Sequence, residues 1–248
     1  MTTRREEIDV ETADGVAHAW IHREAKAPRA AVLFYTDAFG VRPSMHEMAA
    51  RLARLGYLVL LPDVFYRARE FPPFDAATVW SDPPERERLT ALLRSLTPER
   101  MAVDAGAYLG AIAAQRGVRE DRVGVTGYCM GGRLSFLTAA LHPDRVRAAA
   151  AIHAGGLVTD AADSPHRLAQ RVLASLYVGV ADEDRGCTPE QQGTLAAALG
   201  AAHVRYCLEL YPGKKHGFAV SDHAGAYDED AADRHWRRLE SFFGETLG

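Results

Sequence analysis

The residues best suited to covalent chemistry stand at 127–132, where the chain reads Gly-Tyr-Cys-Met-Gly-Gly. Cys129 follows an apolar run typical of a strand and precedes an apolar run typical of a helix. A strand, a tight turn and a helix in this order form a nucleophile elbow, here with cysteine in place of serine. The dipole of the following helix stabilises a thiolate at this position. A structural cysteine in a glycine turn is the alternative, because free cysteines are usually buried.

A nucleophilic thiol needs a base, and the base needs an acid that orients it. In the chain order typical of such elbows, the acid and then a histidine follow the nucleophile. His216 lies in a glycine-containing segment directly after the last apolar run. Three carboxylates, at 182–184, follow the apolar run before that one. We prefer Asp184 as the partner of His216 and keep Asp182 as the reserve.

The apolar pattern predicts the elements that must hold these residues. Short all-apolar runs indicate buried strands, and they alternate with runs of helical spacing. The predicted strands cover residues 30–35, 57–61, 122–126, 147–152, 175–180 and 204–210. Helices are predicted after a capping box at Ser44, after Thr97 and over residues 228–243. A turn at Asp14-Gly15 predicts an N-terminal antiparallel hairpin.

This alternation predicts an α/β fold with a mostly parallel central sheet and helices on both faces. Ligands of such sheets bind beyond the carboxyl ends of the strands, where the candidate residues fall. We expect a single domain over residues 1–248. The segment 67–96 is rich in proline and arginine, and we expect it to form a cap or rim over that edge.

Composition excludes several classes of protein. Apolar residues make up 48% of the 248 residues and charged residues 25%, which is ordinary for a globular chain. The formal charge of −4 offers no basic excess for nucleic acid. No apolar run is long enough to span a bilayer, and the first residues lack the apolar segment of a signal peptide. With only three cysteines, we expect a reduced, cytoplasmic protein without a cysteine metal pair.

From about residue 30 onward the chain resembles the dienelactone hydrolase family, cysteine hydrolases of the α/β-hydrolase fold. The resemblance rests on Thr-Asp-Ala-Phe-Gly-Val at 36–41, Gly-Tyr at 56–57 with Leu-Pro-Asp at 61–63, the elbow at 127–132 and His-Gly-Phe at 216–218. It implies an α/β-hydrolase domain with Cys129 as nucleophile, His216 as base and Asp184 as the orienting acid.

The resemblance also implies an oxyanion hole made by two backbone N–H groups, from Ala38 and Met130. The family typically carries glutamate where this chain has Asp37, and that carboxylate is thought to hold the resting thiol and help ionise it. Asp37 therefore either helps to activate Cys129 or caps its own loop.

The family's type enzyme binds a substrate carboxylate with two arginines. One of them aligns with Arg88, whereas the other falls on Val220, which cannot replace a bidentate arginine. We therefore doubt that a dienelactone is the natural substrate. Arg88 could equally sit on an ordinary charged helix face. Phe39 and His153, which follow predicted strands, complete the expected substrate contacts; a purely structural His153 is the alternative.

Together these features predict a cysteine-dependent hydrolase of small-molecule carboxylic esters or lactones, carboxymethylenebutenolidase-like, acting through a thioester acyl-enzyme. Neither a metal nor a cofactor is expected, and neither nucleic acid nor a membrane is an expected partner. The oligomeric state stays open. A non-catalytic small-molecule binding protein on a hydrolase scaffold is the alternative. A nicotinamide-dependent dehydrogenase is disfavoured, because the glycine turn lies mid-chain and Pro212-Gly213 interrupts the Tyr211–Lys215 pair.

Overall fold

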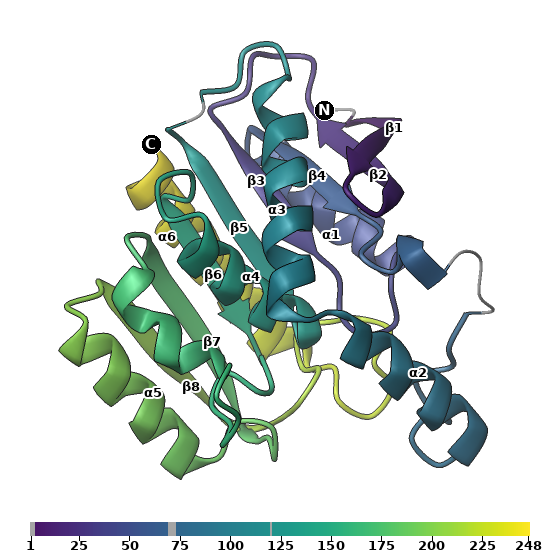
Figure 1. Ribbon diagram of the computed structural model, residues 1–248, viewed down its shortest axis with the longest axis vertical. Coiled ribbons are helices and arrows are strands. Elements are labelled where there is room, and N and C mark those ends of the chain that lie inside the picture. The colour runs from purple at the N-terminus through teal and green to yellow at the C-terminus, as the bar shows by residue number, and fades with distance from the viewer. Residues whose placement is uncertain (1–2, 69–72, 120) are drawn as a thin grey trace.

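A computed structural model describes residues 3–68, 73–119 and 121–248. Its centre is one eight-stranded sheet in the order β1-β2-β4-β3-β5-β6-β7-β8 (Figure 1). The strands are β1 (Arg4–Thr12), β2 (Gly15–Arg23), β3 (Ala30–Tyr35), β4 (Tyr57–Pro62), β5 (Val123–Tyr128), β6 (Ala148–Ile152), β7 (Ser175–Glu183) and β8 (Tyr206–Lys215). β2 pairs antiparallel with β1 and β4, and the other neighbours are parallel. The predicted fold class and N-terminal hairpin are confirmed.

Helices cover both faces of this sheet (Figure 1). The α-helices are α1 (Pro43–Arg54), α2 (Pro83–Ser95), α3 (Pro98–Ala113), α4 (Met130–Leu141), α5 (Pro189–Ala201) and α6 (Glu229–Leu247), and the 3₁₀ helices are η1 (Tyr66–Ala68) and η2 (Pro165–Arg171). Apolar side chains of α3, α4 and α5 pack into one core, and those of α1 and α6 pack into a second core on the other face. The central strands β3, β4, β5 and β6 are therefore buried on both faces, which explains their apolar composition.

The predicted strands and helices agree with the structure within a few residues, with two local differences. β8 continues to Lys215, through Pro212 and Gly213, so His216 follows the strand directly. The capping box predicted at Ser44 is wrong: α1 begins at Pro43 and has no side-chain cap. The Ser44 hydroxyl instead donates to Asp222 Oδ2 at 2.7 Å, a residue far away in the chain.

The segment after β4 leads to the end of the sheet where the parallel strands finish. Asp82 caps α2 by accepting from the Glu85 N–H, and Leu89 is the only buried residue of that helix. In Figure 1, α2 projects from the body of the molecule at this end. Of the predicted cap, residues 69–72 lie outside the described residues. Within the described ranges, no helix is both long and apolar enough to cross a membrane.

Candidate active site

Cys129 occupies a strained turn between β5 and α4. Its backbone has φ 55° and ψ −117°, a conformation that a side chain disfavours. The Cys129 N–H donates to Ile152 O at 3.0 Å, which ties the turn to the neighbouring strand β6. The thiol is partly exposed. A strained backbone at an exposed nucleophile is typical of functional sites, where the surrounding structure holds the conformation in place.

Two glycines explain how the chain turns so sharply here. A Cβ at Gly127 would lie 2.2 Å from the carbonyl oxygen of Gly131. A Cβ at Gly131 would lie 2.3 Å from Thr36 O, in the loop that follows β3. Only glycine allows both approaches, and the second brings the start of α4 against the loop that carries Ala38.

Ala38 and Met130, the two residues expected to supply oxyanion-hole N–H groups, lie beside the cavity at Cys129. Ala38 follows β3, and Met130 is the first residue of α4. Both residues line the same cavity as Cys129. Neither N–H donates to another group in the described part of the chain. The two donors are therefore available to an oxygen atom bound near the thiol.

His216 contacts an acid from the neighbouring strand. Its Nδ1 lies 2.7 Å from Asp184 Oδ2, and the Asp184 side chain is buried. The Gly186 N–H donates to Asp184 Oδ1 at 2.7 Å and holds this carboxylate in place. The alternative acid, Asp182, is exposed and accepts from the Gly213 N–H. Of the two acids left open, Asp184 is the one beside His216.

The neighbours of His216 raise the pKa of its imidazole. Burial lowers this pKa, but Cys129 and Asp184 outweigh burial and raise it to about 11. Cys129 is close enough to His216 to act on the pKa of its ring. The structure brings together Cys129, His216 and Asp184 from the ends of β5, β8 and β7.

Asp37 is fully buried and has partners other than the thiol. Arg42 donates to both of its carboxylate oxygens at 2.7 Å. His223 Nε2 lies 2.9 Å from Oδ2, and the Phe39 N–H donates to Oδ1 at 3.0 Å. Burial raises the pKa of Asp37, but the hydrogen bonds from His223 and Arg42 outweigh burial and hold the pKa far below its ordinary value. Arg42 also pairs with Asp222.

His153 packs against the ring of His216. It is fully buried and has φ 37°, and its ring is T-shaped against that of His216, with centroids 5.0 Å apart. Neither ring nitrogen has a hydrogen-bond partner in the described part of the chain. Burial holds its pKa well below the ordinary value, so the ring is neutral. His153 is not among the described residues that line the cavity.

Arg88 and Phe39, two expected substrate contacts, also lie outside the cavity lining within the described ranges. Arg88 is on α2, bonds to both carboxylate oxygens of Glu85 and lies 3.8 Å over the Phe74 ring. Phe39 is partly buried against His223. Val220 is fully buried.

A cavity of about 790 Å³ opens at Cys129. The apolar part of its wall comes from the end of α2, the start of α3 and the face of α4. Its described lining residues are Ala38, Trp80, Thr90, Leu93, Arg94, Leu96, Thr97, Pro98, Cys129, Met130, Arg133, Leu137, Gly155, Gly156, Thr159, Ala161, Asp163, Ser164 and Pro165. The described residues contain no group of three or more His, Cys, Asp and Glu arranged to hold a metal ion.

Sequence reasoning missed Arg133 in this lining and Arg42 and His223 beside Asp37. The spacing of Arg133, four residues after Cys129, is a usable signal, because residues four apart share one face of a helix. His223 has no such local signal, because it lies 186 residues from Asp37 in the chain.

The fold matches solved α/β-hydrolase structures. The structure described as a "Putative Dienelactone Hydrolase" from Klebsiella pneumoniae superposes with a TM-score of 0.83 at 24% identity, covering 98% of this chain and 99% of that one. The dienelactone hydrolase-like promiscuous phosphotriesterase P91, from metagenomic libraries, gives a TM-score of 0.80 at 24% identity, with both chains fully covered. These matches show that the chain has the α/β-hydrolase fold.

Sequence comparisons then give the family. The model of the dienelactone hydrolase family matches residues 17–247. The "Putative carboxymethylenebutenolidase" of Salmonella typhi is 28% identical over 221 residues, which cover 88% of this chain and 77% of that protein. The carboxymethylenebutenolidase of Rhodococcus opacus is 33% identical over 117 residues, covering 47% of this chain and 41% of that protein. The chain belongs to the dienelactone hydrolase family and is a hydrolase of that type.

Proposed function

We propose that this protein hydrolyses carboxylic esters or lactones through a thioester on Cys129. The observation that carries the proposal is the His216–Asp184 pair, with His216 Nδ1 2.7 Å from Asp184 Oδ2. The nearby Cys129 raises the pKa of His216, stands in a strained turn and lines a cavity. A nucleophile, a base and an orienting group in hydrogen-bond reach form the arrangement that covalent acyl transfer requires.

In the first step, Cys129 Sγ attacks the carbonyl carbon as a thiolate. The carbonyl oxygen takes up the negative charge, and the N–H groups of Ala38 and Met130 stabilise it. The carbon–oxygen bond to the leaving group then breaks, and the imidazolium of His216 donates its proton to the departing alkoxide. The products of this step are the free alcohol, or the opened ring of a lactone, and a thioester on Cys129.

In the second step, neutral His216 removes a proton from a water molecule, and the water oxygen attacks the thioester carbon. The carbon–sulfur bond breaks and leaves the thiolate beside protonated His216, which restores the starting pair. Asp184 orients the imidazole through Nδ1 in both steps. The Asp37 carboxylate accepts from the Phe39 N–H and is held by Arg42 and His223. Its role in this mechanism is therefore to hold the loop that carries the adjacent Ala38.

Hydrolysis of short-chain aryl esters, followed together with the intact mass of the protein, tests the proposal. We expect a burst of alcohol and a transient acyl adduct, both absent from Cys129→Ala. Cys207→Ala is the matched control, since Cys207 is an exposed thiol outside the described cavity lining. Turnover that persists in Cys129→Ala, or an adduct that disappears only in Cys207→Ala, would refute the mechanism.

A further inference from the structure

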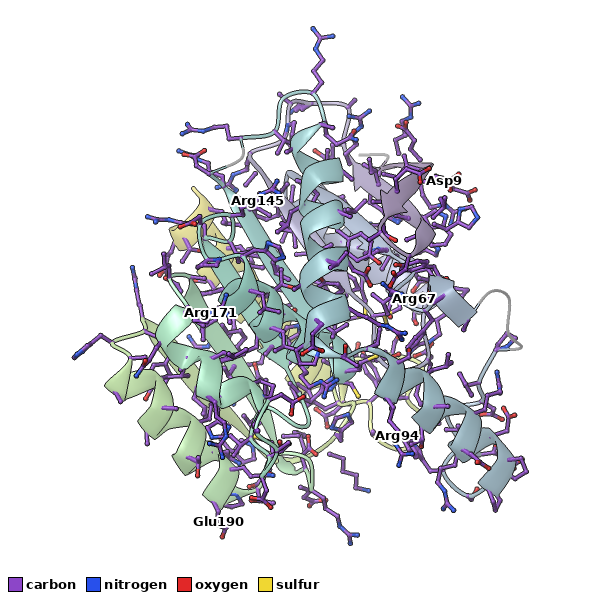
Figure 2. The ribbon with its side chains drawn as sticks, in the orientation of Figure 1. Asp9, Arg67, Arg94, Arg145, Arg171 and Glu190 are labelled. Atoms are coloured by element: carbon purple, nitrogen blue, oxygen red, sulfur yellow. The ribbon has the colours of Figure 1, made fainter. Side chains whose placement is uncertain are left out.

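His153 combines two unfavourable features at the carboxyl end of β6. In Figure 2 this end of the sheet lies toward Arg94 and Glu190, and the other end toward Arg145. The His153 ring is fully buried, and neither ring nitrogen has a hydrogen-bond partner within the described ranges. The backbone has φ 37°, in the left-handed region, and its N–H donates to Gly179 O at 2.7 Å on β7. Strained residues and unpaired buried polar groups cluster at functional sites, where the surrounding structure maintains them.

The His153 ring contacts three aromatic rings from two other segments of the chain. Its centroid lies 5.0 Å from the centroid of His216, 5.5 Å from that of Phe218 and 5.8 Å from that of Tyr128. Tyr128 ends β5 directly before Cys129, whereas His216 and Phe218 follow β8. His153 therefore packs between the segment that carries the candidate nucleophile and the segment that carries the candidate base.

The hydrogen bond with Asp184 fixes one point of the His216 ring but not the plane of that ring. It joins Nδ1 to a single oxygen, Oδ2, 2.7 Å away. The torsion that turns an imidazole about its Cβ–Cγ bond has broad minima, so the preference of the side chain itself adds little. The His216 side chain is 34% exposed, and among the described residues His153 supplies the one aromatic ring in contact with it. This T-shaped contact, at an interplanar angle of 63°, is therefore what can hold the plane.

The His153 ring stays neutral beside a histidine whose charge changes during the proposed reaction. Burial is the main cause that holds the pKa of His153 well below the ordinary value, and the nearby His216, His223 and His235 lower this pKa further. Asp37 acts in the opposite direction. A neutral ring can pack against His216 both as an imidazolium and as a neutral imidazole, whereas a cation at this position would oppose the imidazolium. The contact can therefore persist through both steps.

We propose that His153 is a positioning residue: its ring holds the plane of the His216 imidazole, so that Nδ1 stays on Asp184 while Nε2 is directed at the Cys129 sulfur. The inference rests on the hydrolase function proposed above. The shape of the ring is what acts, because neither nitrogen of His153 has a partner in the described part of the chain with which it could exchange a proton. His153 is also absent from the described cavity lining, so it acts through His216 and not on the substrate.

Alkylation of Cys129 by iodoacetamide between pH 6 and 8 tests the proposal, in the Cys207→Ala background that removes the exposed thiol. His153→Asn removes the ring but keeps a residue type that tolerates positive φ. We expect its alkylation rate at pH 6 to fall at least about fivefold and to rise with pH, because a misplaced His216 no longer supports the thiolate. For phenyl acetate, kcat/KM should fall at least about tenfold, mainly through kcat.

His153→Phe is the conservative variant, since phenylalanine keeps a flat ring and lacks the two nitrogens. Its larger ring should lower stability through overpacking, which urea unfolding measures. We nevertheless expect it to keep the wild-type pH profile of alkylation, with kcat/KM within about threefold of wild type, because the ring still packs against His216. A profile that matches that of His153→Asn would contradict a role for the shape of the ring.

His235→Asn is the matched control for the loss of a buried imidazole. His235 is fully buried on α6 and contacts Tyr128, with ring centroids 5.5 Å apart, but among the described residues it has no ring contact with His216. It should lose stability in urea and keep the alkylation profile. An unchanged profile in His153→Asn, or the same change in His235→Asn, would overturn the role of His153. A changed profile in His153→Asn, in a protein whose wild type releases no phenol from phenyl acetate, would support that role and refute the hydrolase function instead.

Discussion

At the scale of single residues, we expect the reactivity of Cys129 to depend on the charge of His216. Cys129 and Asp184 both raise the pKa of the His216 imidazole. That charge is present below the raised pKa of His216 and is lost as the pH rises through it. The proposed mechanism therefore expects an imidazolium beside the sulfur at neutral pH.

We predict that alkylation of Cys129 by iodoacetamide is fast and nearly independent of pH between 6 and 8. In His216→Asn the thiolate loses its cationic partner, so the rate at pH 6 should fall by about tenfold or more and rise steadily with pH. The measurement is the rate of adduct formation at each pH, with Cys207→Ala as background to remove the exposed thiol. Identical profiles in the two proteins would contradict the pairing.

At the scale of elements, the start of α4 and the loop after β3 hold each other in place. The loop carries Ala38, and the adjacent Asp37 is fully buried. Gly131 allows the start of α4 to approach Thr36 in the same loop. The two N–H donors beside the thiol thus depend on a contact between elements that are 90 residues apart in the chain.

Gly131→Ala tests that contact. Its Cβ would overlap backbone atoms, which cannot move as a flexible side chain can, so we predict a loss of about 1–3 kcal/mol of stability. The displaced donors should also lower kcat by at least about tenfold. Urea unfolding and ester kinetics measure the two effects. Gly110→Ala on α3, where a Cβ meets nothing within 4 Å, should instead be neutral or slightly stabilising.

Asp37→Asn tests the buried ion pair. We predict a loss of about 3 kcal/mol at pH 7, because Arg42 loses its buried partner. The folded-state pKa of Asp37 lies below its unfolded value, so its contribution is full above about pH 5 and is lost as the pH falls further. The stability difference from wild type in urea should therefore narrow below pH 4. Asp222→Asn, which alters a more exposed partner of Arg42, should cost less than about 1 kcal/mol.

At the scale of the whole molecule, the sheet separates two hydrophobic cores, and different residues lie at the two ends of its parallel strands. Cys129, Asp184 and His216 follow the carboxyl ends of parallel strands. The last turns of α6 pack at the other end, where Phe243 contacts Tyr57. A Cβ at Gly124 there would lie 2.8 Å from Leu247 Cδ1 and 3.1 Å from Phe243 Cε1. The candidate catalytic residues and this packing therefore lie at opposite ends of the strands.

Phe243→Ala should lower the stability of the protein without a comparable loss of activity. Removing a fully buried ring is expected to cost about 3–5 kcal/mol, while kcat/KM at a temperature where the variant stays folded should change less than about twofold. Phe243→Leu should cost less because more of the volume is kept. Thermal unfolding and ester kinetics are the measurements, and a fall in kcat/KM that parallels the loss of stability would contradict the separation.

Much of the fold could be predicted because its signals are local. Buried parallel strands are short apolar runs, and the helix after Thr97 begins at a capping residue with proline next to it. Ser44 shows the limit of such signals. Its sequence context matched a capping box, but a proline started the helix one residue earlier and a distant carboxylate took the hydroxyl.

The sequence by itself determined that the candidate residues follow predicted strands, that a glycine turn holds Cys129, and the family resemblance, since these depend on neighbours in the chain. Only the tertiary structure decided which acid stands beside His216, that Asp37 pairs with Arg42 and His223, and that Arg133 rather than Arg88 lines the cavity. Those choices depend on how loops from separate strand ends pack together. His223 lies 186 residues from Asp37, and no local pattern encodes a contact over that separation.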